Sequence, residues 1–179
     1  MIGNAIAGFL GTGVAVSASS YESIATTTVG AGGSATVTFN SIPGTYKHLQ
    51  LRAHYYRSTA ANAVIYFNAD TTSSNYRSHY TEADGASVSA GTVTTYGGIY
   101  SFVNKVQWGA AVIDILDYGN TGKTKTVRIL SGVDNNGTGM LDFNSGLWNT
   151  TNNITSVSCS AIGGNFAQYT SFALYGIKG

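Results

Sequence analysis

Carboxylates are the side chains of this sequence whose spacing comes closest to a catalytic arrangement. Glu82 and Asp84 are two residues apart, so in an extended segment both would project from the same side. A glycosidase needs two carboxylates about 5–9.5 Å apart across a cleft, one as general acid and one as base or nucleophile. Two solvated loop carboxylates would have the same spacing, and we favour that simpler interpretation. The sequence therefore predicts no catalytic residues and a protein that is not an enzyme.

Histidines and one Asn-rich turn are the candidate metal ligands. His48 and His54 fall in one predicted strand, on the same face but about 20 Å apart, and His79 lies far from both in the sequence. We therefore expect surface histidines. The run 134–139 (DNNGTG) offers oxygen ligands for calcium, yet it departs from EF-hand spacing and also suits a hairpin turn. Whether the turn at Asp134–Asn136 binds calcium stays open; otherwise the sequence predicts no metal site and no cofactor.

Three other polar features are explained by structure alone. The run 119–124 (GNTGKT) ends like a phosphate-binding loop but lacks its first glycine and a following helix, so we expect a β-turn. Asp114 interrupts the apolar run 112–116, which we expect to form a central strand covered on both faces. Because an unpaired carboxylate there would be costly, we expect it to pair with Arg128 on a neighbouring strand. The single cysteine, Cys159, is expected to be a buried strand thiol.

Composition excludes several classes of protein. Nine Lys and Arg against eight Asp and Glu give a net charge of +1, and only 9% of residues are charged, against about 25% in a typical soluble domain. Nine scattered cations do not form the basic stripe that nucleic-acid binding needs, so no nucleic-acid partner is expected. With 43% hydrophobic and 12% aromatic residues, the chain is not disordered.

Alternating polar and apolar residues dominate the chain from Tyr21 onward, which is typical of half-buried strands. Apolar residues do not recur at helical spacing over three turns anywhere after residue 20. The sequence therefore predicts an all-β protein: an antiparallel, jelly-roll-type β-sandwich of about 8–10 strands, as one domain over residues 21–179. Strands are expected at 24–29, 35–40, 49–55, 64–67, 98–103, 110–118, 123–133, 154–161 and 170–177.

The segment 68–95 is rich in Ser, Thr, Asn, Asp and Gly, with aromatic residues spaced through it. We expect long surface loops here with at most one short edge strand, and loops of such length are often functional. Tyr76, Tyr80 and Tyr96 are the candidate recognition residues, because tyrosine gives a large contact area at low entropic cost and stacks on sugars. A sandwich core would absorb some of these rings.

Residues 1–20 are expected to form an N-terminal arm ahead of the domain. The arm is apolar, but it is too short for a membrane span of about 20 apolar residues, and no Lys or Arg precedes it as in a signal peptide. We expect no membrane insertion. An exposed apolar arm must rest either on the flank of its own domain or on a neighbouring subunit, and we favour the subunit. The predicted assembly residues are Ile2, Ile6, Phe9, Leu10, Val14 and Val16.

Several stretches are similar to jelly-roll modules in virion proteins of tailed bacteriophages, which are frequent among phages of cyanobacteria and other aquatic bacteria. They are YESIAT at 21–26, SIPGTYKHLQLR at 41–52, IDILDY at 113–118, KTVR at 125–128, SGLW at 145–148 and FALYGIK at 172–178. The resemblance covers about residues 21–56 and 109–178. It implies a jelly-roll fold and a place on the surface of the virion, and it brings no catalytic motif.

Such modules occur in capsid decoration proteins, head fibres and tail fibres alike. The chain is nearly all module, without the shaft that a tail fibre normally adds, and its apolar arm suits a capsid lattice. We therefore expect a trimeric decoration (cement) protein that binds and reinforces the phage head through non-covalent contacts. The alternative is a receptor-binding module of a tail or head fibre, whose partner would be a host surface glycan. Copy number, head or tail location and the strand edges at the subunit interface stay open.

Overall fold

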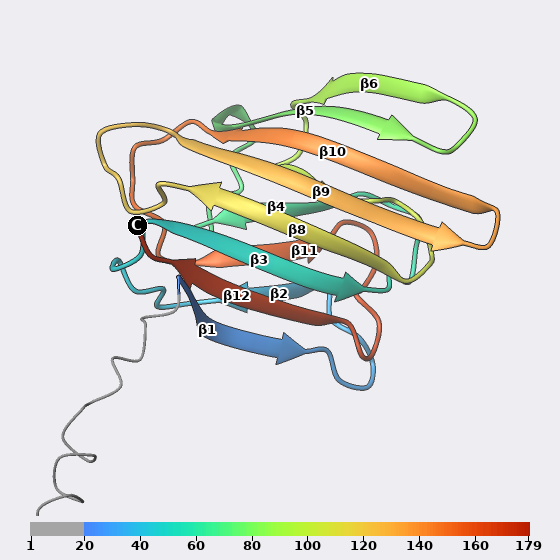
Figure 1. Ribbon diagram of the computed structural model, residues 1–179, viewed down its shortest axis with the longest axis horizontal. Coiled ribbons are helices and arrows are strands. Elements are labelled where there is room, and N and C mark those ends of the chain that lie inside the picture. Colours follow the sequence, from blue (N-terminus) through green and yellow to red (C-terminus); the bar gives the residue numbers. More distant parts are fainter. Residues whose placement is uncertain (1–19) are drawn as a thin grey trace, which may run out of the picture.

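The computed structural model describes residues 20–179, which form a sandwich of two antiparallel sheets (Figure 1). The predicted fold class is confirmed, with more strands than expected. The strands are β1 (Tyr21–Thr28), β2 (Thr36–Phe39), β3 (His48–Tyr55), β4 (Ala63–Phe67), β5 (Tyr76–Ala83), β6 (Val88–Val93), β7 (Ile99–Phe102), β8 (Gly109–Leu116), β9 (Lys125–Asn135), β10 (Thr138–Trp148), β11 (Val157–Ala161) and β12 (Ser171–Ile177), with a 3₁₀ turn at Ser73–Asn75.

One sheet is twice as wide as the other. The wide sheet has eight strands in the order β1-β12-β3-β8-β9-β10-β5-β6, and the narrow sheet has four in the order β2-β11-β4-β7. Without the hairpins β5–β6 and β9–β10, strands β1-β12-β3-β8 face β2-β11-β4-β7, an arrangement compatible with a jelly roll. The part compatible with a jelly roll therefore has four strands in each sheet, and the two hairpins add four further strands to the wide sheet.

The core lies between the sheets and follows the predicted alternation. In β3, Leu49, Leu51, Ala53 and Tyr55 are buried, whereas Arg52 and His54 point outward and are exposed. Strands β8 and β9 repeat the pattern, with alternate residues facing the core. Burying one face of each strand supplies the main favourable free energy of folding.

The segment 68–95 differs from the expectation of long loops. It forms two strands: β5 pairs with β10 over its whole length, and β6 pairs with β5. Their inward positions include Ser78, Glu82, Ser89 and Gly91, so the sequence lacks the apolar alternation that marks a strand. The pairing comes instead from β10, which runs unbroken from Thr138 to Trp148.

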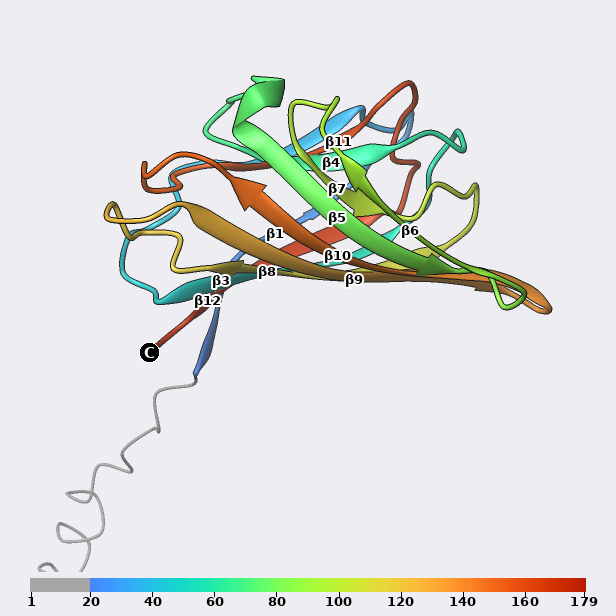
Figure 2. The ribbon, with the colours of Figure 1, turned by 90° about the horizontal axis from the view of Figure 1, so that it is seen from above.

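Asp114 also differs from its expected environment. Strand β8 is covered on one face only, because nothing in the described chain lies against the outer face of the wide sheet (Figure 2). Asp114 and Arg128 do lie opposite each other on β8 and β9. The carboxylate nevertheless accepts a hydrogen bond from Gln50 Nε2 at 2.8 Å, and no ion pair joins it to Arg128 among residues 20–179. On an open face the carboxylate stays partly hydrated and needs no cation.

The predicted arm and its assembly residues lie outside the described residues. Within residues 20–179, no helix has the length and apolar character needed to cross a membrane.

Candidate functional site

A row of large apolar side chains lies on the outer face of the wide sheet. Val112 of β8 pairs with Leu130 of β9, and Leu130 pairs with Phe143 of β10, so the three side chains stand in one line across three strands. Leu141 lies two residues from Phe143 on the same face. Their exposed fractions are 38% for Val112, 49% for Leu130, 54% for Phe143 and 55% for Leu141. We call these four residues the apolar strip.

The apolar strip is not needed to build the sandwich. The inward neighbours Ile113 and Ile129 are at most 1% exposed and already complete the core side of β8 and β9. On a sheet face in contact with water, the outward positions are normally polar. Contiguous exposed apolar side chains of this kind mark surfaces that bind another molecule.

Polar groups border the strip on the β3 side. Arg52 lies opposite Val112, and its guanidinium stands over the rings of Tyr21, at 5.5 Å, and Tyr175, at 5.1 Å. Arg52 Nε also donates to the side-chain oxygen of Gln50 at 2.7 Å, and Gln50 in turn donates to Asp114. An apolar centre with a hydrogen-bonded polar rim is the usual anatomy of a protein interface.

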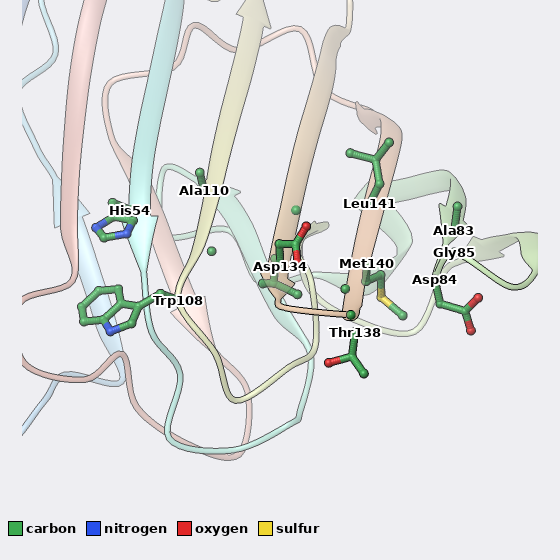
Figure 3. A pocket seen from close by; sticks show the side chains of 15 residues that line it. His54, Ala83, Asp84, Gly85, Trp108, Ala110, Asp134, Thr138, Met140 and Leu141 are labelled. Atoms are coloured by element: carbon green, nitrogen blue, oxygen red, sulfur yellow. The ribbon is translucent and has the colours of Figure 1, made fainter.

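A hollow of about 720 Å³ adjoins the strip at the end of the sheet formed by the β9–β10 turn (Figure 3). Trp108, which immediately precedes β8, stands at one side, and Leu141 and Met140 stand at the other. The indole stacks on the imidazole of His54 with ring centroids 4.7 Å apart and an interplanar angle of 19°. The Asp134 carboxylate also lines the hollow. We call this site the Trp108 hollow.

The three tyrosines predicted to recognise a ligand are buried to different degrees. Tyr76 is only 1% exposed, and its hydroxyl accepts from Phe67 N and donates to Asp70 O, so it is unavailable to a ligand and that part of the prediction is corrected. Tyr80 is half-buried with its ring 5.9 Å from that of Tyr100. Tyr96 is half-buried and its hydroxyl accepts from the side-chain amide of Asn62.

The carboxylates that sequence spacing paired do not act as a pair. Glu82 accepts a hydrogen bond from Ser89 Oγ at 3.0 Å, while Asp84 caps the β5–β6 turn by accepting from Ala86 N and Ser87 N. The residue opposite Glu82 is instead Asp142 of β10, which is fully buried.

Asp142 belongs to a buried polar cluster on the inner face of β9 and β10. Among residues 20–179, its carboxylate oxygens, the side-chain amide of Asn144 and the hydroxyl of Ser131 make no hydrogen bond of normal geometry. Burial is the main cause that raises the pKa of Asp142 to about 6, and the nearby Glu82 charge adds to it. A carboxyl group whose pKa is raised in this way is a common catalytic device, but here it is closed off from solvent.

The other candidate ligands have structural roles. His48 Nδ1 accepts a hydrogen bond from Asp117 N at 2.9 Å. The run 134–139 contains the end of β9, the start of β10 and the two-residue hairpin turn between them, with φ of 44° at Asn136 and 107° at Gly137. Among residues 20–179, no group of three or more His, Cys, Asp or Glu side chains is placed to hold a metal ion. Cys159 is buried in β11, as expected, and burial raises the pKa of its thiol.

Sequence reasoning missed both the apolar strip and the Trp108 hollow. The available signal was that Leu130 and Ile129 are adjacent, so two neighbouring apolar residues must face opposite sides of a strand. The chain matches no protein-family model, and no curated protein matches it in sequence.

Proposed function

We propose that the chain is a virion structural protein of a tailed bacteriophage, a decoration protein that binds and reinforces the head shell. The observation that carries the proposal is the apolar strip, an exposed apolar row on the outer face of the wide sheet that no other segment of residues 20–179 covers. The resemblance of the sequence to phage jelly-roll modules supports the same function. The strand order is compatible with the jelly-roll fold that this resemblance implies.

In this proposal, one surface joins copies of the chain and a second attaches the oligomer to the shell. The strip on β8, β9 and β10 packs against a second copy of the chain, and the apolar residues of the arm hold the oligomer, expected to be a trimer, on the shell. A specific interface buries about 800 Å² on each partner, and each Å² of apolar area contributes about 25 cal/mol. Because only 9% of residues are charged, few charged groups would have to lose water on assembly.

The rim of the strip offers charges for contact between copies. Arg128 and Asp114 stand side by side one row from Leu130, without an ion pair between them. A facing copy can place a carboxylate against Arg128 and a cation against Asp114. Such complementary charges fix the register of an interface whose affinity comes from apolar burial.

Electron microscopy of particles labelled with a gold-conjugated antibody tests this function. The particles are purified from a phage that encodes the chain. We expect many labels per particle, distributed over the head. Labels confined to the tail would overturn the decoration role and favour the receptor-binding module instead. Absence of the chain from washed particles would exclude any virion role.

A further inference from the structure

We propose that the Trp108 hollow binds a neutral saccharide, which stacks on the indole of Trp108 and donates hydroxyl hydrogen bonds to Asp134. This site differs from the tyrosine segment considered in the sequence. The saccharide-binding proposal does not depend on the proposed decoration role.

The indole is exposed and held in one orientation. Trp108 is 41% exposed, although tryptophan is one of the residues that gains most from burial. The indole stacks on the imidazole of His54. The ring of Tyr56 also contacts the indole, with ring centroids 5.5 Å apart and an interplanar angle of 59°. An aromatic ring fixed by its neighbours loses little conformational entropy when a ligand packs on it. The apolar C–H face of a pyranose is the complement of such a ring.

The hollow exists because small residues stand between large ones. A cross-strand row on the outer face runs from His54 of β3 through Ala110 of β8 and Gly132 of β9 to Leu141 of β10. A Cβ atom at Gly132 would lie 3.6 Å from Leu141 Cδ1. Because glycine has no side chain, the backbone of β9 forms the floor of the hollow at this position. The resulting volume of about 720 Å³ lies within the range of about 300–1,000 Å³ that is usual for ligand sites.

Polar groups at the hollow suit hydroxyls. The Asp134 carboxylate is exposed and takes part in none of the side-chain hydrogen bonds or ion pairs found among residues 20–179. Asp84, the other carboxylate of the lining, is already used by the β5–β6 turn. A free carboxylate accepts two hydrogen bonds from neighbouring hydroxyls, and charge-assisted bonds of this kind are strong.

Charge restricts the class of saccharide. The lining contains Asp84 and Asp134 but neither Lys nor Arg. An acidic sugar would be repelled by these carboxylates and would find no cation to pair with. The site therefore selects neutral saccharides over those that carry carboxylate or sulfate groups.

The test uses the purified full chain on an array of neutral and acidic oligosaccharides, followed by titration of the best neutral one. The chain has two tryptophans, and Trp148 is 2% exposed, so a change in fluorescence on binding reports Trp108. We expect at least tenfold weaker binding for Trp108→Ala and for Gly132→Val, which fills the floor, and about fivefold weaker binding for Asp134→Asn. Tyr169→Ala is the matched control, because Tyr169 is 68% exposed but lies outside the lining.

Circular dichroism of each variant checks that the sandwich is intact. Gly132→Val alters the floor of the hollow, and Trp108→Ala alters one of its sides. Binding that survives both changes would overturn the proposal, as would preference for acidic sugars. An array without a neutral saccharide that binds would also overturn it, and would leave the decoration role standing, since that role is tested on particles.

Discussion

Leu130 of β9 and Phe143 of β10 lie directly opposite each other on the outer face of the wide sheet, and about half of each side chain is exposed. Adjacent apolar residues across two strands stabilise a sheet by less than about 1 kcal/mol. The contact between Leu130 and Phe143 therefore stabilises the monomer only slightly, whereas their exposed halves offer apolar area that a partner can bury.

Replacing Leu130 and Phe143 by polar residues should separate folding from association. We expect Leu130→Asn and Phe143→Ser each to change the free energy of unfolding by less than about 1 kcal/mol, because the side chains already meet water. The double variant should sediment as a monomer at concentrations where the original chain is oligomeric. Tyr169→Ser, which removes a still more exposed ring outside the apolar strip, is the control. An oligomer that tolerates the double change would assign the interface to another surface.

Deletion of residues 1–16 tests the arm. All twelve strands of the described chain begin at or after Tyr21, so the sandwich should keep its thermal transition within a few degrees. The truncated protein should no longer attach to phage heads that lack the decoration protein, as measured by co-sedimentation. Normal attachment would remove the role assigned to the arm.

Asp142→Asn should stabilise the protein at neutral pH. Burial raises the pKa of Asp142 from 3.8 to about 6, so the folded state binds its proton more tightly than the unfolded state. The charged carboxylate therefore destabilises the fold above pH 6, and the penalty falls as the pH is lowered from 6 to 4. A shift of about two units corresponds to about 3 kcal/mol.

Urea unfolding of Asp142→Asn and the original chain at pH 7.5 and pH 4 measures this difference. We expect the variant to be more stable by up to about 3 kcal/mol at pH 7.5, with nearly equal stabilities at pH 4. Equal stabilities at both pH values would mean that the carboxylate is not held in a destabilised form.

The contact between Asp70 and Trp148 should show the opposite pH dependence. Burial by itself would raise the pKa of Asp70, but hydrogen bonds from Trp148 Nε1, Asn75 Nδ2 and Thr72 N outweigh it and lower the pKa to about 2. The stabilisation is therefore complete above the unfolded pKa of about 4 and is lost as the pH falls toward 2.

Trp148→Phe keeps the ring and removes the donor. We expect the free energy of unfolding to fall by about 1–3 kcal/mol at pH 7 and the pKa of Asp70 to rise, as followed by NMR titration of its carboxyl carbon. The loss of stability should shrink near pH 2. An unchanged Asp70 titration would show that the indole hydrogen bond does not hold the carboxylate.

Gly146→Ala should destabilise the contact between β10 and β7. A side chain at Gly146 would overlap that of Ile99, a fully buried residue of β7. Crowding of a packed core costs about 1–3 kcal/mol. Gly30→Ala is the matched control, because a side chain there meets no atom within 4 Å. Thermal unfolding of both variants should show a lower midpoint only for Gly146→Ala.

Alternation along the chain was enough to determine the fold class and the core face of individual strands. In the stretch 48–55 the apolar residues are the buried ones, because a strand places successive side chains on opposite faces. The same rule failed for β5, because its inward positions include polar residues such as the buried Ser78, and the strand is held in the sheet by pairing with β10. Local periodicity therefore does not mark a strand that has polar residues on both of its faces.

The candidate sites were decided by tertiary structure alone. His54 and Trp108 meet because β3 pairs with β8, and Glu82 faces Asp142 because β5 pairs with β10. Alternation places Leu130 on the opposite face of β9 from Ile129, but it does not say whether that face is covered. Leu130 is exposed because the narrow sheet covers one face of the wide sheet and leaves the other open. Composition and periodicity are properties of single segments, whereas strand register and the covered face follow from the summed packing of strands distant in sequence.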